Sequence, residues 1–71
     1  MKEILLTNDN LAEIKEWVGK SRFVLILDSA YWTKTGTSPY KASAQLFTRR
    51  FFSTELCKTM MKDKAVKVAL A

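Results

Sequence analysis

The segment Tyr31–Arg50 brings together side chains of the types that bind anions. Two hydroxyl side chains, Thr37 and Ser38, stand between two lysines, Lys34 and Lys41. If a helix begins at Ser38, its first backbone N–H groups are unpaired and carry positive partial charge. The segment therefore predicts an anion site at a helix N-terminus, and simple capping of the helix by these hydroxyls is the alternative.

Further basic residues extend this candidate site along the chain. In a helix that follows the loop, Lys41 and Arg49 lie on one side, roughly 12 Å apart along the axis, with Arg50 at the flank. Lys58 and Lys62 continue the surface if the next helix folds alongside. Arginine offers a planar fork to phosphate and lysine a point charge, so the pattern favours a polyanionic partner.

Aromatic side chains accompany these charges. Tyr31, Trp32 and Phe52 are large rings that would stack on unpaired bases if they are exposed beside the cations. Such stacking is typical of binding to RNA or to single-stranded DNA. The alternative is that these aromatics pack in the core, because a short chain needs most of its rings inside.

Residues for catalysis or metal binding are scarce. The chain has no histidine, one cysteine and two isolated glycines, so we expect no catalytic residues, no metal and no cofactor. Asp28 follows a buried strand, where α/β enzymes often place a carboxylate, but aspartate there more often begins a turn. Cys57 is expected to be a small apolar core residue rather than a reactive thiol.

Length and charge limit the classes of protein to which the chain can belong. Seventy-one residues form one domain at most, 1–71, and a net charge of +5 is concentrated in the second half. Residues 1–30 carry a net charge of −1 and residues 31–71 a net charge of +6. No signal-like leader opens the chain and its apolar runs are too short to span a bilayer, so we expect a reduced, cytoplasmic protein with no membrane partner.

The first thirty residues predict a strand, a helix and a second strand. "KEILLT" is the first strand, and a short amphipathic helix follows from Asp9 to Val18, capped by Asn10 or Asp9 and ended by Gly19. Five apolar residues, Phe23–Leu27, predict a strand that is buried on both faces. This order favours a right-handed parallel crossover, with an antiparallel arrangement as the alternative.

The rest of the chain predicts further helices and a last strand. A strand over Tyr31–Thr35 would end at Gly36, and a helix would begin at Pro39 and break near Ser53, where the apolar stripe changes phase. A third helix would carry Leu56, Cys57, Met60 and Met61 on one face. The last segment, "KAVKVALA", alternates like a strand, with a helix left open.

These observations predict a small α/β or α+β domain of about three strands with two or three helices, in the order β-α-β-loop-α-(α)-β. No motif is specific enough to indicate a family. The expected function is a non-catalytic basic module that binds nucleic acid. The alternative is an inhibitor or adaptor that docks its basic face on an acidic partner protein, compatible with a virus- or plasmid-encoded regulator; self-association stays open.

Overall fold

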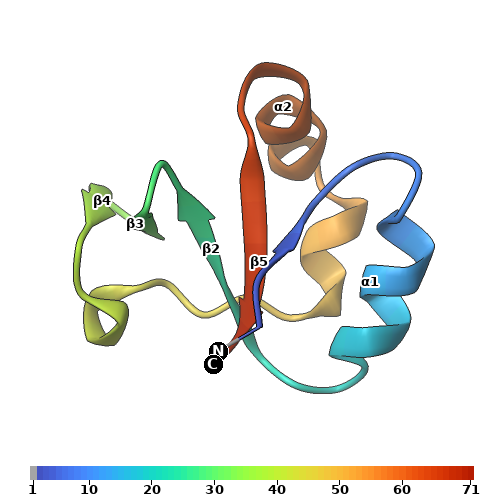
Figure 1. Cartoon of the computed structure of the whole chain (residues 1–71), viewed down its shortest axis with the longest axis horizontal. Helices are drawn as coiled ribbons and strands as arrows, with labels where there is room; N and C mark the ends of the chain where they lie inside the picture. Colours follow the sequence, from blue (N-terminus) through green and yellow to red (C-terminus); the bar gives the residue numbers. More distant parts are fainter. Residues whose placement is uncertain (1) are drawn as a thin grey trace.

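Five strands form one antiparallel sheet in the order β1-β5-β2-β3-β4. The computed structural model describes residues 2–71, and within them two α-helices and two short 3₁₀ helices join the sheet in an α+β domain (Figure 1). The elements in chain order are β1 (Ile4–Leu5), α1 (Leu11–Val18), β2 (Phe23–Leu27), β3 (Ala30–Thr33), β4 (Gly36–Ser38), η1 (Lys41–Ser43), η2 (Arg49–Ser53), α2 (Glu55–Asp63) and β5 (Val66–Leu70).

The last strand is an internal strand of the sheet, between β1 and β2. β5 pairs antiparallel with β1 on one side and with β2 on the other, in the registers Ile4↔Val68 and Leu25↔Val68. The terminal strand predicted from the sequence is therefore confirmed. β1 and β2 run parallel to each other, as the crossover prediction required, but β5 lies between them. They are not neighbours, and every strand pair in the sheet is antiparallel, the arrangement that was the alternative. The sheet has five strands where about three were predicted, so the predicted fold is confirmed only in part.

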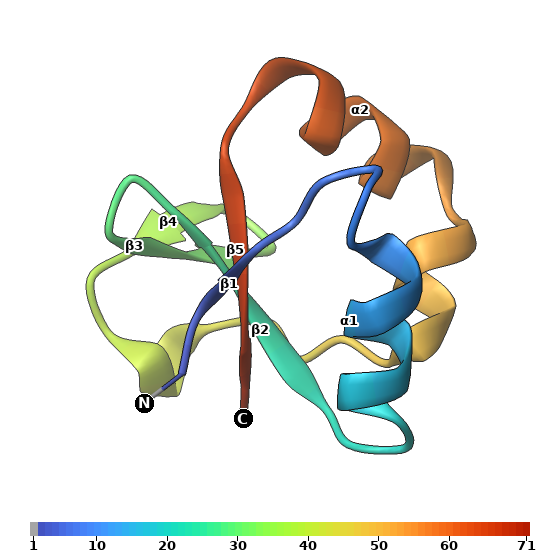
Figure 2. The same ribbon diagram turned by 45° about the vertical axis from the view of Figure 1, so that its right-hand side comes forward.

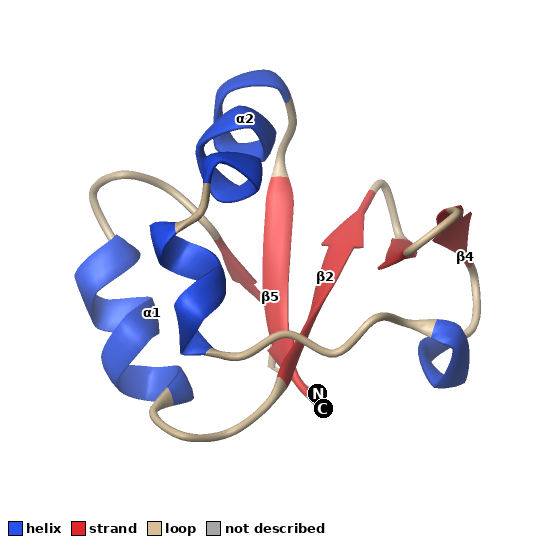
Figure 3. Ribbon diagram, turned by 180° about the vertical axis from the view of Figure 1, so that it is seen from behind, coloured by secondary structure: helices blue, strands red, loops and turns tan. Residues whose placement is uncertain are grey.

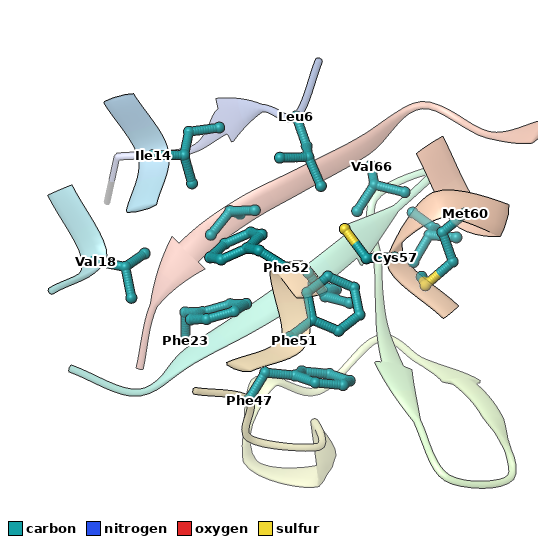
Figure 4. Close-up of a cluster of buried hydrophobic side chains, with 13 residues drawn as sticks. Leu6, Ile14, Val18, Phe23, Phe47, Phe51, Phe52, Cys57, Met60 and Val66 are labelled. Carbon is teal, nitrogen blue, oxygen red and sulfur yellow. The ribbon is translucent and has the colours of Figure 1, made fainter. Parts of the chain in front are cut away.

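The strand β2 is buried on both faces, as five consecutive apolar residues predicted. Its side chains alternate between two clusters: Phe23, Leu25 and Leu27 face the helices, and Val24 and Ile26 pack with Ala69 on the opposite face. Three helices cover the first face, namely α1, η2 and α2, which lie on one side of β5 in Figures 1 and 2. The larger core fills the space between them and the sheet (Figure 4).

Helix α1 begins and ends close to the predicted residues. Asn10 is its N-cap residue, yet its side chain makes no capping bond. Instead its side-chain Oδ1 accepts from the Thr7 N–H at 2.8 Å, and its side-chain Nδ2 donates to the Leu5 carbonyl at 2.7 Å. Asn10 thus fastens the turn from β1 into α1. Gly19 ends the helix with a φ of +55°, the positive φ that a glycine there predicts.

The helix predicted from Pro39 to the break near Ser53 is wrong. The strand predicted to end at Gly36 ends at Thr33, and a tight turn leads from it into β4. β3 and β4 form a hairpin in which Gly36, the first residue of β4, pairs with Thr33. Residues 44–48 then run extended beside the sheet. The Phe47 N–H donates to the Phe23 carbonyl at 2.8 Å, and the Phe23 N–H donates back to the Phe47 carbonyl at 2.9 Å. This pairing overrides the local helical pattern.

The predicted break and the helix after it are confirmed. Thr54 caps α2, and its hydroxyl oxygen accepts from the Cys57 N–H at 3.2 Å. The 3₁₀ helix η2 lies directly before the break, and its residues Phe51 and Phe52 are buried against the sheet. The change of phase seen in the sequence therefore marks the junction of η2 and α2.

Candidate functional site

Four exposed cations lie on the two consecutive helices η2 and α2. Arg49 and Arg50 project from η2, while Lys58 and Lys62 lie one turn apart on α2. We call these four residues the η2–α2 basic surface. η2 contacts both α1 and α2, so the surface is carried on packed helices rather than on a loop.

Burial of the apolar residues turns these cations outward. Phe51 and Phe52 point into the core from η2, which leaves the two arginines that precede them in solvent. On α2, Cys57 and Met60 are buried and Lys58 is exposed beside them. The helical phase of the sequence predicted this exposure of Lys58 and Lys62, and the structure confirms it.

Acidic side chains neutralise little of this charge. Lys58 Nζ lies 3.8 Å from Glu55 Oε1, but both side chains are mostly exposed, so solvent screens the pair. Within residues 2–71, no carboxylate oxygen lies within 4.0 Å of the charged nitrogens of Arg49, Arg50 or Lys62. The η2–α2 basic surface therefore offers at least three cations to an external anion.

A cavity of about 380 Å³ opens beside Lys58 and Lys62. It is bounded by the turn before α1, by the first residue of α1, by η2 and by α2. Its lining residues are Asn8, Leu11, Phe52, Cys57, Lys58, Met61 and Lys62. The lining therefore combines apolar side chains and a thiol with two lysines and an amide. Sequence reasoning missed Asn8 and Leu11, because only the tertiary packing of α1 against η2 brings them here.

Cys57 is a core thiol, as predicted. It is buried, and its Sγ donates to Met61 Sδ at 3.7 Å. Burial raises the pKa of Cys57 above the ordinary value, while the charge of Lys15 lowers it to a smaller extent. The thiol therefore stays protonated at neutral pH, which is unsuited to a nucleophile.

The predicted anion site at Thr37 and Ser38 is wrong, because no helix begins there. Both residues belong to β4, and the first helical segment after them, η1, is a single 3₁₀ turn. The Ser38 hydroxyl oxygen accepts from the Tyr40 N–H at 3.2 Å, within the local turn. The free helical N–H groups on which the prediction depended are absent from this loop.

The aromatic residues are less accessible than a stacking surface needs. Phe52 is only 5% exposed and stacks on Phe23 in the core, so its prediction as an exposed ring is wrong. Tyr31 and Trp32 are half-buried and pack against different clusters on opposite faces of the sheet. The three rings therefore do not form one platform.

The two remaining predicted cations lie elsewhere. Lys34 is at the tip of the β3–β4 hairpin, which Figures 1 and 3 show across β5 from η2 and α2. Lys41 is in η1, and its Nζ donates to the Leu70 carbonyl at 3.1 Å. The predicted helix that was to align Lys41 with Arg49 does not exist. The six nominated cations therefore do not form one continuous surface, because Lys34 and Lys41 lie outside the η2–α2 basic surface.

Asp28 occupies a turn, the more common of its two predicted roles. With Ser29 it forms the two-residue connection from β2 to β3, and both residues have positive φ. Asp28 also lines a cavity of about 560 Å³ together with Asp63 and Lys64. Within residues 2–71, no group of three His, Cys, Asp or Glu side chains gathers as a metal site.

No helix within the described residues is both long and apolar enough to cross a bilayer. Two features of the described residues bear on function: the cavity beside Lys58 and Lys62, and the η2–α2 basic surface, which the aromatic core supports. Comparisons of the chain with family models, with characterised proteins and with solved structures gave no match.

Proposed function

We propose that this chain is a small, non-catalytic module that binds nucleic acid through the η2–α2 basic surface. The observation that carries the proposal is the exposure of four cations on two adjoining helices, three of them without a carboxylate partner among residues 2–71. Cations held in this way attract phosphate groups, and their binding releases the counterions that are condensed on the nucleic acid.

The scaffold under the surface supports this function. Phe51 and Phe52 anchor η2 in the aromatic cluster, with their ring centroids 5.7 Å apart. Lys58 and Lys62 are one turn apart, about 6 Å along the axis. The backbone positions of these lysines are therefore fixed relative to those of the arginines. Binding then costs only the conformational freedom of the side chains.

The contact is one-sided. The α1 helix carries the exposed carboxylates Glu13 and Glu16, which repel a polyanion. A bound strand should therefore follow η2 and α2 and avoid the outer face of α1. Phosphate contacts alone carry no sequence information, so the proposed binding is general in sequence.

The non-catalytic part of the proposal follows from the side chains available. The chain has no histidine, and its one thiol is buried with a raised pKa. Asp28 serves the β2–β3 turn. Nothing among these groups supplies a general base matched to neutral pH.

The experiment is a matched charge comparison. Affinity for a mixed-sequence oligonucleotide is measured by fluorescence anisotropy at low salt for Arg50→Gln/Lys62→Gln and for the control Lys20→Gln/Lys34→Gln. The two variants lose the same net charge, but the control residues lie outside the η2–α2 basic surface. We expect a loss of about tenfold or more for the first and about twofold for the control. Equal losses, or no binding by the wild type, would refute the proposal.

A second candidate function is docking on a partner protein, and one observation favours it. Tyr40 is 70% exposed and Leu46 is 49% exposed. Leu46 lines a mostly apolar cavity of about 370 Å³ with Val24, Ala44 and Lys41. Exposed apolar side chains beside a cavity are typical of protein interfaces. A partner that stays bound after nuclease treatment, is lost with Leu46→Asp and is kept with Arg50→Gln/Lys62→Gln would support this function instead.

A further inference from the structure

The cavity beside Lys58 and Lys62 combines two kinds of wall. Leu11, Phe52 and Met61 provide apolar surface, while the two lysines form part of the η2–α2 basic surface. An occupant that matches both must be apolar in one part and anionic in the other. A nucleotide has these two parts, since the faces of its base are apolar and its phosphate is charged.

We infer that this cavity holds one unstacked base of a single-stranded nucleic acid, with the flanking phosphates on Lys58 and Lys62. The inference rests on the proposed function and goes beyond it by assigning a base site. The volume of about 380 Å³ lies within the range of about 300–1,000 Å³ that is usual for small-ligand sites. A base in an intact duplex is paired and stacked and cannot enter.

The charge pattern favours a strand over a free small anion. Two further cations, Arg49 and Arg50, are exposed on η2, the element that also contributes Phe52 to the wall of the cavity. A small apolar anion would fill the cavity and leave these arginines unused. A strand places one base in the cavity and its further phosphates on the arginines, so it matches the whole surface.

Asn8 adds a polar group suited to the edge of a base. Its side chain is exposed, lines the cavity, and makes no hydrogen bond to the described residues. The neighbouring Asn10, by contrast, uses its amide in bonds to Thr7 and Leu5. A free amide offers one donor and one acceptor side by side, the pair that reads the N6 and N7 atoms of adenine.

The test compares a single strand with a duplex of the same length, using wild type and Leu11→Trp. The larger ring fills the cavity and leaves all four cations in place. We expect Leu11→Trp to weaken binding of an oligo(dA) strand by about tenfold and to change duplex binding by less than about twofold. Asn8→Ala should weaken the same strand by a smaller factor of about three. Thermal unfolding of each variant verifies that it is folded.

A second measurement uses the unmodified protein, in case Leu11→Trp does not fold. Leu11 and Met61 line the cavity and are only partly buried, so the ring current of a base that stacks there shifts the NMR signals of their methyl groups. At saturation, oligo(dA) should shift both signals at least about fivefold more than saturating duplex, which controls for binding elsewhere on the protein. Equal shifts with strand and duplex, or equal loss of binding to both in Leu11→Trp, overturn the base site and leave the proposed function standing. Absence of binding to both removes the proposed function itself.

Discussion

The ring of Phe23 stacks on the ring of Phe52, with centroids 5.1 Å apart and planes inclined by 12°. Phe23 lies in the buried strand β2 and Phe52 in η2, so this contact fixes the segment that carries Arg49 and Arg50 to the sheet. Phe47 and Phe51 complete the cluster, each with its ring centroid 6.0 Å from that of Phe23. The position of the basic surface therefore depends on the aromatic core.

Truncation of Phe52 should destabilise the fold strongly. Phe52→Ala removes a ring that is 5% exposed and leaves a cavity in the core, so we expect the free energy of unfolding to fall by about 3–5 kcal/mol. The control Leu46→Ala, at a side chain that is 49% exposed, should cost less than about 1 kcal/mol. Urea denaturation measures both, and a similar loss for the two variants would contradict the assignment of Phe52 to the core.

The turn between β2 and β3 should tolerate glycine but not a β-branched residue. Ser29 has a φ of +67°, and Asp28 before it has a φ of +49°, the backbone of a type I′ hairpin turn. Ser29→Gly relieves the steric cost and should leave the free energy of unfolding unchanged or raise it by up to about 1 kcal/mol. Ser29→Val should lower it by about 1–2 kcal/mol. Equal stabilities in urea denaturation would mean that this turn has another geometry.

The titration of Cys57 should weaken the fold at alkaline pH. Burial raises the pKa of this thiol above 9.0, so the folded chain holds the proton more tightly than the unfolded chain. The contribution to stability is complete below the unfolded pKa, and it is lost as the pH rises from about 9 through the higher folded pKa. Cys57→Ala lacks this dependence and keeps every other side chain, so the comparison of the two proteins isolates the contribution of the thiol. The stability advantage of wild type over Cys57→Ala should therefore be smaller at pH 10 than at pH 7.5; a constant advantage would argue against a buried protonated thiol.

Local patterns predicted the elements whose residues act within one segment. The helix α1, the doubly buried strand β2 and the last strand β5 follow from apolar spacing over fewer than ten residues. The junction before α2 was visible because the apolar stripe changes phase at Ser53. In each case, the neighbours that decide the structure stand close in sequence.

The segment from Gly36 to Phe47 could not be predicted in the same way. Its helical spacing is real in the sequence, but the partners of its backbone lie elsewhere: the Gln45 N–H donates to the Trp32 carbonyl, and Phe47 pairs with Phe23. These tertiary hydrogen bonds decide the conformation, and the spacing alone does not contain them. The anion site predicted at Thr37 and Ser38 failed for this reason.

The residues of the candidate site divide in the same way, into those that local patterns predicted and those that only tertiary packing brings together. Exposure of Lys58 and Lys62 followed from helical phase. Arg49 and Arg50 were nominated from their positions on a predicted helix that does not exist, and they are exposed because the residues that follow them are buried. The cavity beside the two lysines depends on the packing of α1 against η2, which brings Asn8 and Leu11 to it and which no local pattern indicates. Lys34 was nominated from its place in the loop before a predicted helix, and it lies in the turn of the β3–β4 hairpin, which Figure 1 shows across β5 from η2 and α2.

Salt dependence of nucleic-acid binding tests the central claim most directly. For each phosphate contact, the logarithm of the binding constant falls with the logarithm of salt concentration by about 0.7–0.9. We predict a steep slope for the wild type, and a slope shallower by about 1.4–1.8 for Arg50→Gln/Lys62→Gln, which lacks two of the four cations. The control Lys20→Gln/Lys34→Gln should keep the wild-type slope. A wild-type slope near zero, or the same slope in all three proteins, would contradict binding through η2 and α2.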